Sequence, residues 1–463
     1  MILNRYEESK ISNRNLPEEW KSQSSLDELE IFLQQNWEQR SVFYTEKNVT
    51  SKQQFLDFIA HQGIRTKNYI GTIVFRGEQL NIYPKMFRPY SDDDEDDGKN
   101  ELTQKHLMSN LVKWLDYCNR VEYPFISISS ELEDTEDLKE LFITLYIRYV
   151  QSALERGLYY QYVEETEDIS SIKGKFDLKD YLIRKIPSGQ GNRFRCTYSN
   201  FEFDNKVNRI IKFTCKQLMN FTTEKNQRLI RNILMKLNDV EDIKCVPSDC
   251  DSIRLSKMQG FYHVIISMSK MFLLNQMSNY SMDMNESFCF LFPTELLFEG
   301  FIGGFIKDVV QEHGGKVYLQ RSDMKLVDSI EYAGRSYGGA FTMRLDILAE
   351  IKGKVFILDT KYKNYSRFED NPDEINKMVN EETHQGDVYR VCEYARKRGA
   401  SEVFLLYPMY RYEEKELIFP TGKSSGPNGD INIHFIRLPF VFEEDEQKTK
   451  EQLREVIENI FEL

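Results

Sequence analysis

The sequence predicts a multidomain protein of mixed α+β and α/β class. Its 463 residues exceed the ~250–300 residues at which a single hydrophobic core usually stops growing. A hydrophobic content of 41% and an aromatic content of 13% suffice for large buried cores. The spacing of apolar residues also changes along the chain. It predicts an amino-terminal mixed α/β region over 1–160, a mainly helical middle region over 161–285 and a carboxy-terminal α/β domain over 286–463.

The amino-terminal region is expected to begin with mixed helix and loop over residues 1–50. Two strand-like runs, Tyr69–Phe75 and Gln79–Tyr83, flank Gly77 and predict a hairpin that ends at Pro84. The acidic run Asp92–Asp97 predicts a solvated loop. Helical spacing of apolar residues then predicts two helices, over Leu107–Tyr117 and Leu138–Glu155.

The rest of the chain changes from helical patterns to alternating helices and strands. The middle region holds a basic loop over Arg184–Arg195 and helical patterns over Lys206–Phe221 and Gln227–Leu237. In the carboxy-terminal domain we expect helices over Thr294–Glu312, Glu381–Arg398 and from about Asp445. Strands are predicted over Lys316–Arg321, Val327–Tyr332, Phe341–Glu350, Val355–Lys363, Glu402–Tyr407, Glu416–Phe419 and Ile431–Leu438.

Composition narrows the function classes. A net charge of −13 argues against tight DNA binding by this chain alone, because neutralising phosphates needs clustered Lys and Arg. The seven cysteines lack a CxxC pair, which argues against a zinc site and predicts reduced thiols. No GxxxxGK[ST] motif occurs, so nucleotide hydrolysis is not expected. Without an apolar leader or membrane-length run, we expect a soluble, cytoplasmic protein that does not associate with membranes.

The most informative stretch is residues 341–365, FTMRLDILAEIKGKVFILDTKYKNY. Lys352-Gly353 predicts a two-residue hairpin turn, because Gly tolerates positive φ. Cross-strand partners then have residue numbers that sum to 705, which places Asp346 opposite Asp359 and Arg344 opposite Lys361. Strand alternation puts Asp346, Asp359 and Lys361 on one face. A one-residue change in the turn would break this pairing.

Directly opposed carboxylates make this hairpin a candidate metal site. Their Cβ atoms would lie roughly 4.5–5.5 Å apart, where like charges repel. Such a pair raises a pKa or binds a cation, and carboxylate oxygens suit Mg²⁺, with Mn²⁺ as the alternative. Lys361 would polarise the attacking water or stabilise the phosphate. The competing interpretation is a surface hairpin with scattered acidic residues, since Asp-x-Lys alone is common.

The helix predicted before the hairpin offers a third carboxylate. Its apolar stripe is typical of core, and Glu295 and Glu299 lie at the border of that stripe. We predict Glu299 as a further catalytic and metal-binding residue and Glu295 as a solvated one. Gly303-Gly304 would allow another backbone to approach closely. An Asp strand, an Asp-x-Lys strand and a helix Glu together predict a PD-(D/E)xK endonuclease-like domain that hydrolyses DNA phosphodiesters.

The helix predicted after the hairpin, in HQGDVYRVCEYARKRG, adds a tyrosine. Nucleases with this core often place a Gln and, four residues later, a Tyr near the metal. Two registers stay open: Gln385 with Tyr389, and Arg390 with Tyr394. Tyr394 is predicted as a site residue, and core packing of its ring is the competing interpretation.

Taken in order along the chain, several segments resemble the McrC family, the nuclease subunit of McrBC-type restriction systems. FLFPTELLFEGFI resembles the family's LFE-containing helix, and MRLDI with ILDTKYK its Asp and Asp-x-Lys strands. GDVYRVCEYA resembles a helix of the form Asp-x-Tyr-Gln-x-x-x-Tyr. Upstream, YIGTIVFRGEQLNIYPKMF, ERGLYYQYVEETEDISSIKGKFD and CTYSNFEFDNKVNRIIKF resemble its amino-terminal and middle regions.

The resemblance implies Mg²⁺-dependent cleavage of double-stranded DNA by a subunit docked on a hexameric, McrB-like AAA+ GTPase that it stimulates. Such a partner would explain the acidic charge and the missing nucleotide-binding motif. Two departures are Arg390 where the family has Gln and Leu345 where the motif has Pro. The alternatives are a stand-alone PD-(D/E)xK repair or defence nuclease and a non-catalytic activator of a ring NTPase.

We expect the first 285 or so residues to form the partner-binding part and residues 286–463 to fold without them. Two copies are expected to pair through the nuclease domain, because one active site cuts one strand. A basic residue of the partner-binding part could reach the partner's nucleotide site. The sequence does not choose among the candidates Arg65, Lys67, Arg76 and Arg209.

Overall fold

The structure is a computed structural model of the chain. It describes residues 1–38, 52–59, 62–87, 138–157, 159–220, 222–255, 287–363, 385–409, 420–426, 429–442 and 446–463, with shorter stretches inside 107–117 and 262–273. The predicted loop over Asp92–Asp97 and strand over Glu416–Phe419 lie outside the described residues.

Contacts between residues divide the chain into two compact units. One contains residues 1–38, 46–138 and 284–463, and the other contains residues 39–45 and 139–283. The mixed α/β architecture with several sheets is confirmed. The division at residues 160 and 285 stays a prediction, and the first unit combines residues from both ends of the chain.

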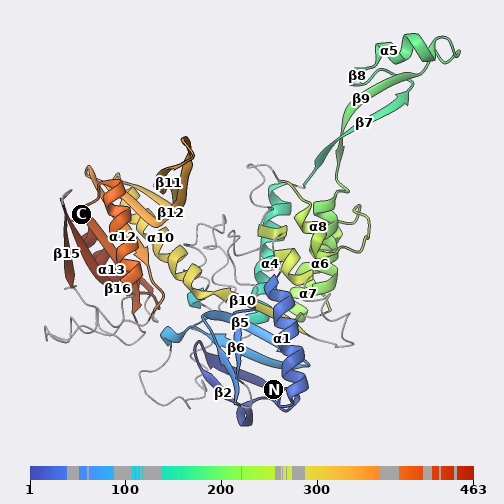
Figure 1. Cartoon of the computed structure of the whole chain (residues 1–463). Coiled ribbons are helices and arrows are strands. Elements are labelled where there is room, and N and C mark those ends of the chain that lie inside the picture. The colour runs from blue at the N-terminus through green and yellow to red at the C-terminus, as the bar shows by residue number, and fades with distance from the viewer. Residues whose placement is uncertain are drawn as a thin grey trace. The chain divides into compact units, whose positions relative to one another are not determined.

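A four-stranded sheet opens the first unit, in the order β1-β6-β5-β10 (Figure 1). The predicted hairpin is confirmed as β5 (Tyr69–Phe75) and β6 (Glu78–Tyr83). Strand β1 (Ile2–Tyr6) pairs parallel to β6, and β10 (Phe288–Pro293) pairs antiparallel to β5. The expected mixture of helix and loop is wrong for the first residues, because β1 depends on pairing with a strand about 75 residues later, which no local pattern reveals.

Other elements cover this sheet or extend it. A three-stranded sheet has the order β2-β4-β3, formed by β2 (Lys10–Ser12), β3 (Leu56–Ile59) and β4 (Gly63–Thr66). Helix α1 (Gln23–Glu38) packs its buried Phe32 against Phe75 of β5, with ring centroids 5.6 Å apart.

A six-stranded sheet with the order β11-β12-β13-β14-β16-β15 forms the carboxy-terminal part of the first unit. Strands β13, β14 and β16 run parallel, while β11, β12 and β15 run antiparallel to their neighbours. The strands span β11 (Lys316–Tyr332), β12 (Arg335–Ile351), β13 (Lys354–Thr360), β14 (Glu402–Met409), β15 (Thr421–Gly426) and β16 (Gly429–Pro439).

Helices pack on both faces of this sheet. Helix α12 (Gln385–Arg398) buries Val391 and Ala395 with Leu348 and Ile357 on one face. On the other face lie α10 (Thr294–Glu312) and α13 (Glu446–Phe461). Gly303 of α10 approaches the side chains of Leu319 and Ile347. The predicted close backbone approach is confirmed at Gly304, where a Cβ would meet the carbonyl oxygen of Tyr117 at 1.9 Å.

Strands β11 and β12 are longer than predicted. Three short strands were expected between Lys316 and Glu350, and the structure has two strands of 17 residues each instead. The intervening polar and glycine-rich residues still pair across the hairpin, with one irregularity between Arg321 and Met324. Local composition suggested loops there, but a partner strand satisfies the backbone groups.

The second unit combines helices with an extended arm (Figure 1). Its helices are α4 (Leu138–Arg156), α6 (Lys206–Leu218), α7 (Glu224–Lys236) and α8 (Pro247–Asp251), so all three predicted helices over Leu138–Leu237 are present. The arm consists of β7 (Gln161–Ile169), β8 (Lys175–Phe176) and β9 (Phe194–Glu202), with short helices α5 (Leu178–Asp180) and η5 (Tyr181–Lys185) at its end. These strands were not predicted, and part of the expected basic loop is helical.

Within the described residues, no helix has the length and apolar character needed to cross a membrane. Six of the seven cysteines lie in the described part of the chain, all of them buried and without a disulfide.

Candidate active site

The turn between β12 and β13 sets the geometry of the site. Lys352 and Gly353 both have positive φ, 51° and 76°, as a two-residue turn of this kind requires. Five cross-strand pairs follow, from Ile351 with Lys354 to Ile347 with Leu358. All five have residue numbers that sum to 705, so the predicted register is confirmed.

Beyond the last of these pairs, Asp346 binds the partner strand through its side chain. Its carboxylate accepts hydrogen bonds from the Thr360 backbone N–H and hydroxyl, each at 3.0 Å. Lys361 does not pair with Arg344, because its N–H donates to the Leu406 carbonyl of β14 at 2.8 Å. The Asp346 carboxylate thus fixes the end of β13 from one side.

Asp359 is a buried carboxylate, with only 3% of its surface exposed. Burial raises its pKa, and the charge of Asp346 raises it further, while Lys361 and Arg390 act in the opposite direction. Two aspartates are therefore close enough to interact electrostatically, as the hairpin register predicted.

Lys361 shares the site and forms an ion pair with Asp359. Its side chain is 12% exposed, and its Nζ also lies 3.9 Å from Asp387 Oδ1. The two partners sit at the carboxyl end of β13, beside the parallel strand β14. In open α/β sheets, this end of the strands is where ligands usually bind.

The first turns of α12 complete the cluster with Asp387 and Arg390. The Arg390 guanidinium donates to both Asp359 oxygens, at 3.2 and 3.4 Å, and lies 3.4 Å from Asp387. Asp387 also contacts Lys363 at 3.1 Å. Burial acts to raise the pKa of Asp387, but Lys361, Lys363 and Arg390 outweigh it, and the pKa is lowered. Burial likewise opposes charge on Arg390, yet Asp359 and Asp387 raise its pKa.

Asp387 and Thr360 were missed by the sequence reasoning. The available indication for Asp387 was the aspartate that begins the Asp-x-Tyr pattern of its helix. No sequence pattern indicated Thr360, because its role depends on where the Asp346 carboxylate points.

The structure distinguishes the two registers that the α12 sequence left open. Gln385 donates to the Tyr389 hydroxyl at 2.6 Å, and Tyr389 is 65% exposed, so this pair does not bond to Asp359. The other register brings Arg390 to Asp359 and leaves Tyr394 half-buried against the apolar cluster beneath α12. Tyr394 lies near enough to Arg390 to affect its charge, and a direct role for Tyr394 stays a prediction.

Glu299 and Glu295 belong to α10, which covers the face of the sheet opposite α12. Glu299 is partly buried and Glu295 is exposed. Within the described residues, no group of three or more His, Cys, Asp or Glu side chains is arranged to hold a metal ion, so Glu299 is not assembled with the two aspartates. Asp346 and Asp359, which interact electrostatically, offer oxygen donors of the kind that suits a hard divalent cation.

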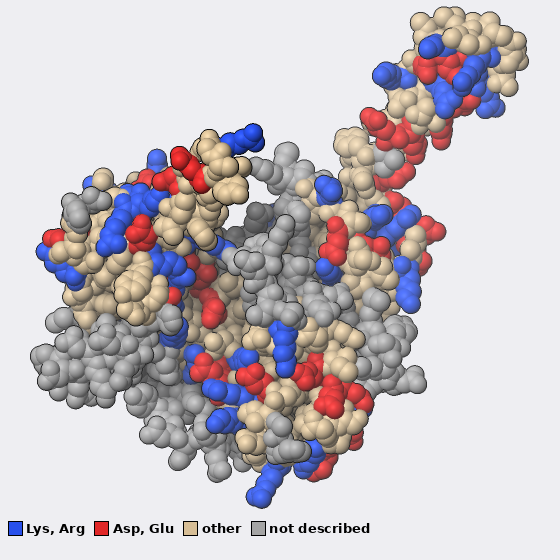
Figure 2. All heavy atoms as spheres, viewed as in Figure 1, with Lys and Arg blue, Asp and Glu red and all other residues tan. Residues whose placement is uncertain are grey.

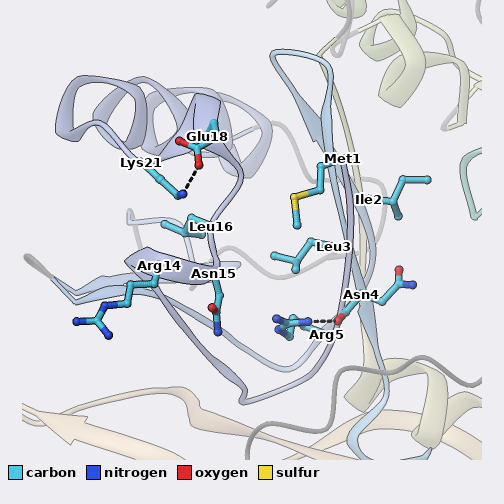
Figure 3. Close-up of a pocket in the computed structure, with 10 residues that line it drawn as sticks. All are labelled: Met1, Ile2, Leu3, Asn4, Arg5, Arg14, Asn15, Leu16, Glu18 and Lys21. Atoms are coloured by element: carbon cyan, nitrogen blue, oxygen red, sulfur yellow. Dashed lines mark hydrogen bonds and ion pairs between the residues drawn. The ribbon is translucent and has the colours of Figure 1, made fainter.

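A separate surface pocket of about 490 Å³ lies at the amino terminus of the chain (Figure 3). Its lining includes Arg5, which donates to the Asn4 carbonyl at 2.8 Å, and Lys21, which pairs with Glu18. None of the predicted site residues lines this pocket.

Three of the four basic residues suggested for a partner's nucleotide site form ion pairs within the chain. Lys67 contacts Asp57 at 2.8 Å, Arg76 pairs with Glu28, and Arg209 holds Asp204 through two bonds of 2.7 and 2.8 Å. Arg65 is exposed on β4, and no ion pair joins it to another described residue.

The geometry defines a class of protein: a mixed α/β fold with a buried Asp359, a partly buried Asp346 and Lys361 at a strand end. A family model described as "McrBC 5-methylcytosine restriction system component" matches residues 64–408. This match covers well over half of the chain, so the chain belongs to that family, and the resemblance to McrC is confirmed.

A solved structure shares the fold, and a second one matches in part. One described as "Refined half-complex from tetradecameric assembly of Thermococcus gammatolerans McrB AAA+ hexamers with bound McrC" has a chain with TM-score 0.63 and 16% identity, covering 99% of this chain and 100% of that one. A second, "Cryo-EM structure of the Thermococcus gammatolerans McrBC complex", matches with TM-score 0.47 and 20% identity over 66% of this chain and 86% of that one. No curated protein matches the sequence.

Proposed function

We propose that this chain is the Mg²⁺-dependent DNA endonuclease subunit of an McrBC-type restriction system, acting in the cytoplasm. It cuts DNA when docked on an McrB-like AAA+ GTPase hexamer, whose GTP hydrolysis it stimulates. The observation that carries the proposal is Asp359, buried beside Asp346 and paired with Lys361 at the end of β13. This arrangement supports assigning residues 286–463 to the PD-(D/E)xK endonucleases.

Asp346 and Asp359 would hold the divalent cation, and Glu299 stays a predicted further ligand. When bound, the cation lowers the pKa of a water molecule and neutralises charge on the phosphate. Lys361 and Arg390 balance the charge of Asp359, and Lys361 would orient the attacking water when a cation takes over that balance. Tyr394 and Arg390, on the same helix, would contact the phosphate.

Family membership and the net charge of −13 support a partner that grips the DNA. The arm of the second unit supports a docking role. Its far end exposes apolar side chains that a water-exposed surface does not favour, namely Ile172, Leu178, Leu182, Ile183 and Ile186. Figure 2 shows acidic side chains along the stalk of the arm, and Lys, Arg and some acidic side chains among uncharged residues at its end. We assign this end to contact with the AAA+ partner.

The body of the arm end is ordered, so these apolar residues do not belong to an unfolded tip. Tyr181 and Phe194 stack with centroids 5.2 Å apart, and Phe176 packs against both. Asp177 accepts a hydrogen bond from the Asp180 N–H at 3.0 Å and caps the short helix. A preformed surface loses little conformational entropy when it docks.

Double-strand cleavage would use two copies of the chain brought together on the partner assembly through the nuclease domains, because one acidic hairpin supplies one active site. The alternatives are a stand-alone nuclease and a non-catalytic activator. Arg65, the exposed member of the four basic residues, is the one we assign to stimulation of the partner's GTPase.

One reconstitution separates these functions. The chain and an McrB-like AAA+ protein are purified, and DNA cleavage is measured with GTP and Mg²⁺ and with each component omitted. We expect cleavage only when all are present. Cleavage without the partner supports the stand-alone nuclease, whereas GTPase stimulation without cleavage supports the activator; either result contradicts the proposal.

A further inference from the structure

Glu7, directly after β1, is one of the most deeply buried charged residues of the described chain, with 1% of its surface exposed. Its carboxylate accepts three hydrogen bonds. The Lys85 backbone N–H at 3.0 Å and the Tyr362 hydroxyl at 2.8 Å bind Oε2, and the Thr294 hydroxyl binds Oε1. The donors come from three segments that are far apart in the sequence.

Two of these donors belong to the elements that carry the proposed active site. Tyr362 directly follows Lys361 and is 4% exposed. Thr294 is the first residue of α10, the helix of Glu299. The third partner, Lys85, is itself buried, pairs with Glu8 at 2.8 Å and holds its ammonium 5.1 Å from the centre of the Tyr362 ring. Tyr362 is therefore held both at its hydroxyl and at its ring face.

Lys361 lies between two anchored neighbours. On one side, Asp346 accepts both hydrogen bonds of Thr360; on the other, Glu7 accepts the hydroxyl of Tyr362. Burying a carboxyl group is costly unless donors satisfy it, and Glu7 has three. A side chain that must present its amine to a reacting phosphate benefits from a backbone fixed at both ends.

We propose that Glu7 is a positioning residue of the active site, which holds the Lys361 segment through Tyr362 and the start of α10 through Thr294. The amino-terminal strand is then part of the support of the nuclease site and not only of the partner-binding part. This inference rests on the proposed nuclease function.

The test compares Glu7→Ala, Tyr362→Phe and the double variant in the complete complex. We expect Tyr362→Phe to lower kcat about tenfold with unchanged KM for DNA, as loss of one buried hydrogen bond would give. Glu7→Ala loses all three hydrogen bonds and should lower kcat at least as much. The double variant should lose no more than Glu7→Ala alone. Glu7→Gln should keep most of the activity, because its amide oxygen can accept from Tyr362 while its NH₂ faces the Thr294 hydroxyl.

Glu402→Ala is the matched control. Glu402 accepts side-chain bonds from Asn432 at 2.8 Å and His434 at 2.7 Å at the other end of β14, and its removal should leave kcat unchanged. Equal losses in Glu402→Ala, additive losses in the double variant, or full activity in Glu7→Ala would overturn the inference.

Amide hydrogen exchange over Thr360–Lys363 in the full chain tests the same inference without DNA cleavage. Exchange should accelerate in Glu7→Ala and Tyr362→Phe but not in Glu7→Gln or Glu402→Ala. Wild-type protection in Glu7→Ala would refute the positioning role. If the wild-type complex does not cut DNA, the proposed function fails, and exchange still decides whether Glu7 fixes this segment.

Discussion

At the scale of single residues, Lys361 and Arg390 both bind the Asp359 carboxylate, while Asp346 repels it. An isolated buried charge would be far more costly than this compensated one. A metal ion could therefore replace the Lys361 or Arg390 side chain as the counter-charge of Asp359 without a change in strand β13.

Arg390→Gln tests this exchange. Arg390 forms an ion pair with Asp359, and its side chain is half-exposed. An ion pair of this kind stabilises the charged carboxylate by ~0.5–1 kcal/mol. Its removal should lower the Mg²⁺ concentration for half-maximal cleavage by about two- to fivefold, measured by Mg²⁺ titration of the cleavage rate. Tyr389→Phe, which alters the exposed neighbour on the same helix, should leave the titration unchanged. A rise in the Mg²⁺ requirement of Arg390→Gln would show that Arg390 does not compete with the metal.

Glu7 makes stability depend on pH. Burial raises its pKa from 4.5 to about 7, against the effect of its hydrogen bonds. Between these two pH values Glu7 keeps its proton in the folded protein and loses it in the unfolded chain. The stabilisation that Glu7 contributes to the folded state is therefore complete below pH 4.5 and is lost as pH rises through about 7. Relative to Glu7→Gln, the free energy of unfolding of the wild type should fall by about 3 kcal/mol across this window. Chemical denaturation of both proteins at several pH values measures it; a constant difference would contradict the prediction.

The sequence predicts part of this residue-scale picture. Asp346, Asp359 and Lys361 follow from one two-residue turn and the period of a strand, both of which are local. Glu7 lies 355 positions from Tyr362, and nothing in its neighbourhood indicates a buried hydrogen-bond acceptor. Arg390 reaches Asp359 and Asp387 reaches Lys361 only because α12 packs on that face of the sheet.

At the scale of elements, local patterns locate helices well and strands less well. The bounds of α10 are those predicted, because its apolar stripe runs unbroken from Thr294 to Glu312. The strands of the arm escaped prediction because β7 is rich in Glu and has no apolar alternation. Its stability comes from pairing with β9 along nine residue pairs.

The arm end gives a prediction at this scale. Leu182 and Ile183 are 54% and 62% exposed, so Leu182→Asp and Ile183→Asp should leave the fold intact. If the arm docks on the AAA+ partner, each change buries a charge in an apolar contact and should weaken binding at least about tenfold. Ile330→Asp, at an exposed position of β11, is the control that should bind normally. Partner affinity is measured by titration calorimetry; wild-type affinity in both arm variants would remove the arm from the interface.

At the scale of the whole molecule, the ends of the chain build one unit. The Trp114 ring stacks on Phe440 with centroids 4.1 Å apart, and its Nε1 donates to the Phe440 carbonyl at 2.8 Å. Asn110 donates to the Phe442 carbonyl at 3.1 Å, and β10 pairs with β5. Domain boundaries predicted from local sequence patterns place these partners in different domains. Pairing between distant segments has no effect on the local spacing of apolar residues.

These contacts revise the expectation that residues 286–463 fold without the amino-terminal part. A fragment of these residues would expose Phe440 and leave β10 without its partner strand. We expect it to unfold at lower temperature than the full chain and without a single cooperative transition. Calorimetry of the two proteins provides the measurement. A cooperative transition at the full-length temperature would restore independent folding.

The central claim is that Asp359 belongs to a metal-dependent nuclease site, and Asp359→Ala tests it most directly. The variant should keep its fold, its partner binding and its GTPase stimulation, because Asp387 stays beside Lys361 and Arg390 as their counter-charge. DNA cleavage by the complex with GTP and Mg²⁺ should fall by at least about 100-fold, the loss typical of a missing electrostatic group. Asp430→Ala, at an exposed ion pair with Lys423 in the same sheet, should cleave normally. Wild-type cleavage by Asp359→Ala would contradict the account.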